Sequence, residues 1–84
     1  MSSSTQEAPV VSFSSFVVSL ATSAMTHLGQ GPQAAVDLPL ARQTIDLLAV
    51  LQEKTRGNLD DEERKLLETV LHETRTKYIE QANE

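Results

Sequence analysis

Few residues in this chain have the types and spacing that support chemistry. His27 falls between Phe16 and Leu20 on a helical wheel, where an imidazole could act as a ligand or a pH switch. Its place on the apolar edge of a helix favours a boundary residue with one hydrogen bond. Glu68 and His72 are four residues apart and could offer two ligands to a metal. They lie on a polar helix side, which favours an ordinary solvated pair.

Two further groups of charged residues favour structural interpretations. The acidic run 60–63 lies where the dipole of a following helix stabilises negative charge, and it lacks the alternating ligands and glycine of a calcium loop. Arg42 and Asp46 are four apart, which predicts a surface ion pair that a second protomer could convert into an interfacial contact. The chain shows no nucleophile beside a base and no Gly-rich phosphate loop, so we expect no enzyme activity and no catalytic, cofactor or metal site.

Composition sets the class of protein. The chain has 84 residues, 39% of them hydrophobic, no cysteine and a net charge of −5. A single domain of this size without disulfides is marginally stable alone, so we expect it to form a homo-oligomer, a dimer or larger. The negative charge disfavours nucleic acid and anionic membranes as partners. No basic region precedes an apolar segment, which predicts a cytoplasmic protein without a secretory signal.

The elements that carry these residues follow from local signals. The stretch 38–56 is predicted to be the central helix, with Asp37 as N-cap, Pro39 in the first turn and Gly57 as the stop. Its apolar arc is wider than a surface helix needs, so we expect this arc to form the core and to need more than one neighbour. Val50 lies outside the arc. The residues of the arc are Leu40, Ala41, Thr44, Ile45, Leu47, Leu48, Leu51 and Thr55.

Two other helices are predicted on either side. Residues 12–28 form the first, with Ser12 as N-cap, and residues 60–81 form the third, with Asp60 and Glu63 as a capping pair. Short loops favour an up-down-up arrangement. Residues 1–11 are Ser-rich and are predicted to be a disordered tail. The fold class is therefore all-α, a three-helix domain of residues 12–82 that self-association completes into a helical bundle.

The first helix has an unusual polar side, which we call the hydroxyl face. It carries no charge, whereas solvated helix faces normally carry Lys and Glu. Small hydroxyl residues let a second backbone approach closely, so this face, together with Val50, is predicted to be a contact surface. The alternative is a neutral exposed surface. The residues of the hydroxyl face are Ser15, Ser19, Thr22, Ser23 and Thr26.

Four stretches of the chain together suggest a family resemblance: SLATSA at 19–24, HLG at 27–29, ARQTID at 41–46 and EKTRGNL at 53–59. With these stretches, the segment from about Val11 to Tyr78 resembles the bacterial domain-of-unknown-function (DUF) family 1844. The resemblance implies a small, helical, cytoplasmic bacterial protein without an assigned activity, and it supplies no catalytic residues.

These observations predict a non-catalytic module for protein–protein interaction or oligomerisation, with an unidentified protein as a further possible partner. Two alternatives stay open. One is a small-ligand or metal-binding module that uses His27 or the pair Glu68 and His72. The other is peripheral membrane association through the first helix. Its high content of Ser and Thr disfavours a spanning segment.

Overall fold

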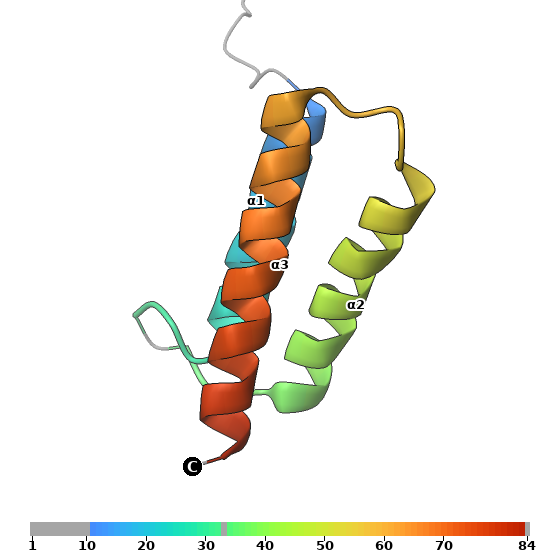
Figure 1. The fold of residues 1–84 in the computed structure, drawn as a ribbon. Helices are drawn as coiled ribbons and strands as arrows, with labels where there is room; N and C mark the ends of the chain where they lie inside the picture. The colour runs from blue at the N-terminus through green and yellow to red at the C-terminus, as the bar shows by residue number, and fades with distance from the viewer. Residues whose placement is uncertain (1–10, 33, 84) are drawn as a thin grey trace, which may run out of the picture.

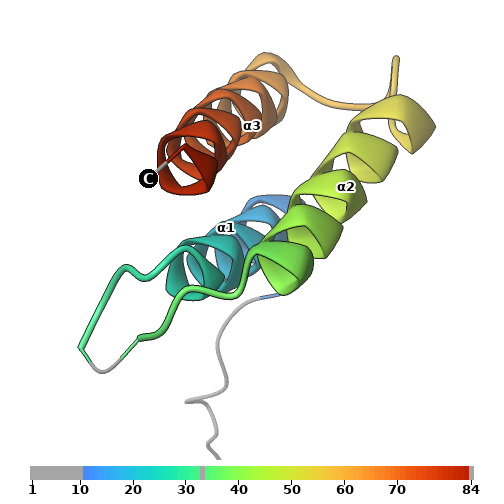
Figure 2. The same cartoon turned by 90° about the horizontal axis from the view of Figure 1, so that it is seen from below.

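The computed structural model describes residues 11–32 and 34–83. Its helices are α1 (Phe13–His27), α2 (Leu38–Lys54) and α3 (Asp61–Ala82), and consecutive helices run in opposite directions, with α1 and α3 descending and α2 ascending in the view of Figure 1. Each helix contacts the other two, and from below they stand at the corners of a triangle (Figure 2). The predicted all-α three-helix fold is therefore confirmed. The predicted N-terminal tail lies outside the described residues except for Val11, which is exposed.

The helices begin at the caps that the sequence predicts. The Ser12 hydroxyl accepts a hydrogen bond from the Ser15 N–H at 3.0 Å, and the Ser15 hydroxyl accepts one from the Ser12 N–H at 3.0 Å. The Asp37 carboxylate accepts from the N–H of Leu40 at 3.1 Å. At α3, Asp60 and Glu63 form a reciprocal capping box. These bonds satisfy N–H groups that have no partner within the helix.

The end of α1 is fixed by a glycine and by the segment that follows. Gly29 has a φ of 89°, and the Gln30 N–H donates to the Met25 carbonyl at 2.9 Å, as in a Schellman motif. The chain then returns, and the Asp37 N–H donates to the His27 carbonyl at 2.7 Å. This bond holds the N-cap residue of α2 against the last residue of α1.

The core lies between the three helices. The buried threonine hydroxyls among the described residues are satisfied locally, because Thr44 donates to the Leu40 carbonyl at 3.0 Å and Thr74 donates to the Val70 carbonyl at 2.8 Å. The buried apolar side chains are Val17, Ala24, Leu28, Ala41, Ile45, Leu48, Leu67, Val70 and Leu71.

The prediction that the whole apolar arc of α2 forms the core is wrong. Ile45 and Leu48 are buried, but Leu40 is 42% exposed and Leu47 is 49% exposed. On α1, the apolar Phe16 is likewise 48% exposed. The physical reason is the number of neighbours, because α1 and α3 cover one side of α2 and leave its outward side to solvent (Figure 2).

Candidate functional site

The outward side of α2 forms one shallow depression of about 490 Å³, which we call the α2 outer face. Three large apolar side chains are exposed there, Leu40, Leu47 and Val50. The full set of lining residues is Pro39, Leu40, Arg42, Gln43, Asp46, Leu47 and Val50. A helix at the edge of a monomer normally presents charged residues outward, so this apolar content is unusual.

Helical geometry sorts these residues into three rows. Leu40 and Leu47 are two turns apart and form one edge of the face. Arg42 and Asp46 are one turn apart and form the opposite edge. Between the edges run the remaining residues, Pro39, Gln43 and Val50. The face therefore has an apolar edge, a charged edge and a mixed middle row.

The charged edge is only loosely paired within the chain. Arg42 Nε lies 3.6 Å from Asp46 Oδ1, and each side chain is 64% exposed. An exposed pair of this geometry contributes less than about 1 kcal/mol to stability, because water and salt screen it. Both predicted residues are thus brought together, and both remain accessible to a partner.

The structure places the residues predicted as one contact surface on two different surfaces. Thr22 and Thr26 border a groove of about 500 Å³ between α1 and α3, whereas Val50 belongs to the α2 outer face. Ser19 is exposed and Ser23 is half-buried. Two hydroxyls of the hydroxyl face also serve α1 itself, since Ser15 takes part in the capping box and Thr26 donates to the Thr22 carbonyl at 2.9 Å.

The residues considered as metal ligands do not gather into a cluster. His27 is half-buried at the end of α1. On α3, Glu68 forms an ion pair with Arg64 at 3.4 Å, and both Glu68 and His72 line a shallow depression beside α2. Within residues 11–32 and 34–83 no group of three or more His, Cys, Asp and Glu side chains could hold a metal ion.

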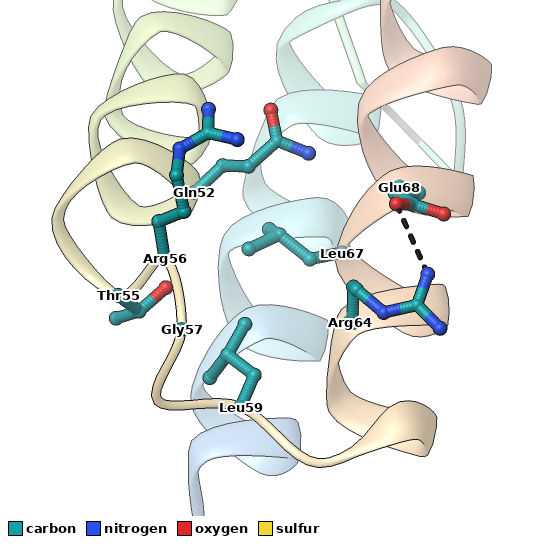
Figure 3. Close-up of a pocket in the computed structure, with 8 residues that line it drawn as sticks. All are labelled: Gln52, Thr55, Arg56, Gly57, Leu59, Arg64, Leu67 and Glu68. Atoms are coloured by element: carbon teal, nitrogen blue, oxygen red, sulfur yellow. Dashed lines mark hydrogen bonds and ion pairs between the residues drawn. The ribbon is translucent and has the colours of Figure 1, made fainter.

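A second candidate pocket lies where α2 ends and α3 begins (Figure 3). Its volume is about 290 Å³, and Leu59 and Leu67 lie between two polar sides. Gln52 and Arg56 stand on the side of α2, and Arg64 stands with Glu68 on the side of α3; Thr55 and Gly57 complete the lining.

Both arginines of this pocket already have carboxylate neighbours. Arg56 donates a hydrogen bond to Glu53 at 2.9 Å, and this bond and the attraction between the charges lower the pKa of Glu53 and raise the pKa of Arg56. Arg64 lies 3.4 Å from Asp61 and from Glu68. An anionic ligand would have to compete with these carboxylates for the guanidinium groups.

Comparison with known protein families identifies the family of this domain. The family described as domain of unknown function (DUF1844) matches residues 10–80, which include all of α1 and α2 and most of α3. The chain belongs to the DUF1844 family. No curated protein and no solved structure matches this DUF1844 chain. Among the described residues, no helix is both long and apolar enough to cross a membrane.

Sequence reasoning found the charged edge of the α2 outer face but assigned its apolar edge to the core. The available signal was the width of the apolar arc on the central helix. An arc too wide for its neighbours indicates that part of it is buried by something else or remains exposed.

Proposed function

We propose that this DUF1844 domain is a non-catalytic oligomerisation module that works in the cytoplasm and associates through the α2 outer face. The observation that carries the proposal is the exposure of Leu40, Leu47 and Val50 on one side of one helix. Single exposed apolar residues are common on monomers, whereas a set on one helix face indicates a contact surface.

Energetics support association. Fully burying a leucine stabilises by about 1.5–3 kcal/mol, so covering a half-exposed one contributes roughly 1 kcal/mol. The chain has no cysteine for a disulfide, and a three-helix domain of this size has a small core. Burying these exposed side chains between two chains would therefore add to the small folding stability of the single domain.

Sedimentation equilibrium of the full chain over a wide concentration range tests the proposal. We expect a mass above that of one chain, 9.2 kDa, and a melting temperature that rises with concentration. The variant Leu47→Lys should shift the mass toward one chain. Ile79→Lys on α3 is the matched control, because Ile79 is also apolar and is 58% exposed. A single-chain mass and a constant melting temperature at all concentrations would contradict the proposal.

Metal binding through His27 or the pair Glu68 and His72, and membrane association through α1, stay alternative predictions. A metal titration followed by calorimetry and a liposome sedimentation assay test them. Metal uptake that His27→Ala abolishes would favour the first alternative, and cosedimentation with liposomes would favour the second.

A further inference from the structure

The α2 outer face is nearly symmetric about its own middle. The midpoint between Leu40 and Leu47 falls between Gln43 and Thr44, and the midpoint between Arg42 and Asp46 falls at Thr44. In the middle row, the midpoint between Pro39 and Val50 falls just after Thr44. These three midpoints agree within about 1.5 Å along the helix axis, the rise of one residue.

Building on the proposed self-association, we propose that a second copy of this chain covers the α2 outer face, with the two α2 helices antiparallel across a two-fold axis near Gln43 and Thr44. A two-fold axis makes an interface from the same patch on both chains, and it requires that patch to be complementary to itself. Because the three midpoints coincide, each of these three pairs on the α2 outer face is matched across the same axis, and the face meets this requirement.

The two-fold axis places the same edge of each α2 helix side by side and makes the two helices run in opposite directions. A two-fold axis perpendicular to both helices keeps the charged edge of one chain beside the charged edge of the other. Reversal then brings Arg42 opposite the partner's Asp46, and Asp46 opposite the partner's Arg42. On the other edge, Leu40 lies opposite the partner's Leu47, so apolar groups meet apolar groups.

Charge distinguishes this arrangement from a parallel one. In a parallel pair, the two-fold axis runs along the helices and exchanges the two edges, so the charged edge of one chain would lie beside the apolar edge of the other, and Arg42 and Asp46 would have no charged group opposite them. In the antiparallel pair, both contacts between Arg42 and the partner's Asp46 join opposite charges. Because the ion pair within each chain is loose, at 3.6 Å and 64% exposed, each side chain can also reach across the interface.

Two complementary charge variants test the contact between chains. Arg42→Glu leaves two negative side chains on the charged edge, and Asp46→Arg leaves two positive ones. We expect each variant alone to dimerise about tenfold or more weakly than the native chain, because two attractive contacts become repulsive. An equimolar mixture should form a one-to-one heterodimer with near-native affinity, measured by native mass spectrometry. Repulsion within each chain is the same alone and mixed, so recovery reports only on contacts between chains.

Cysteine pairs test the direction of the helices. The chain has no cysteine, so Gln43→Cys and Lys54→Cys each introduce a single thiol. Both positions lie on the same side of α2, three turns apart. Under mild oxidation we expect Gln43→Cys to form a disulfide-linked dimer and Lys54→Cys to remain unlinked. Efficient linkage at both positions would indicate parallel helices and would overturn the proposal.

The outcomes separate this inference from the function on which it rests. If the native chain is a single-chain species at all concentrations, self-association itself fails. If the native chain is oligomeric, but the mixed charge variants do not recover and Gln43→Cys does not link, self-association holds and this interface is wrong. Circular dichroism of each variant shows that the helices are intact before either conclusion is drawn.

Discussion

Leu47 and Leu48 are adjacent in α2, yet Leu48 is fully buried and Leu47 is 49% exposed. One residue rotates the helix by about 100°, which is enough to move a side chain from the core to the outer face. The two leucines therefore lie in different environments, Leu48 in the core and Leu47 at the solvent-facing side of α2.

The pair predicts different effects of one substitution. Leu48→Ala should lower the free energy of unfolding by about 2–5 kcal/mol, because it leaves a cavity in the core. Leu47→Ala should lower the free energy of unfolding by less than about 1 kcal/mol at concentrations where the chain is monomeric. Urea denaturation at low concentration measures both. Equal costs would contradict the assignment of Leu47 to the outer face.

Glycine substitutions test the end of α1. A Cβ on Gly29 would lie 2.9 Å from Val36 Cγ2, and the φ of 89° is strained for any L side chain. We expect Gly29→Ala to destabilise the domain by at least about 1–2 kcal/mol, since strain and contact add. Gly31→Ala is the control, because its φ of 104° is also positive but its Cβ would meet open space. Thermal unfolding of both variants should show the larger loss at Gly29.

The first residue of the α3 capping box should contribute to stability. Asp60→Ala removes the acceptor for the Glu63 N–H at 2.8 Å, and we expect a loss of about 0.5–2 kcal/mol in urea denaturation. Asp60→Asn keeps an acceptor oxygen and should retain most of that stability. If both variants lose the same amount, the cap acts through its charge and not through its hydrogen bond.

The contact between Glu53 and Arg56 predicts a dependence on pH. The hydrogen bond from Arg56 lowers the pKa of Glu53, so the pair stabilises the fold above the usual pKa of a glutamate. This contribution is lost as the pH falls through the lowered pKa. NMR titration of the Glu53 carboxyl should show the lowered pKa in the native chain and a return toward the usual value in Arg56→Gln or in high salt. No change in Arg56→Gln would exclude the arginine as the cause.

Two charge insertions decide between the contact surfaces. Leu47→Glu places a charge in the α2 outer face, and Ser19→Glu places one in the hydroxyl face. If the α2 outer face joins the chains, Leu47→Glu lowers the mass in solution and Ser19→Glu leaves it unchanged. The prediction that the hydroxyl face is the contact requires the opposite result. Light scattering over a range of concentrations distinguishes them.

The sequence alone determined the three helices and their first residues. Ser12, Asp37 and Asp60 cap the helices as predicted, because a cap depends on side chains within three residues of the helix start. The sequence also indicated the ion pair of Arg42 and Asp46, since one helical turn separates them.

Only the tertiary structure decided which side of α2 is the core. The regular turn of α2 sets the direction in which each side chain points. Whether that side chain is buried depends on where α1 and α3 pack. They cover Ile45 and Leu48 and leave Leu40 and Leu47 exposed. The apolar edge of the candidate contact surface was therefore hidden within a pattern that, read alone, indicated a core. The sequence contains the symmetry of that surface, yet its exposure follows from the packing of three helices around one side of α2.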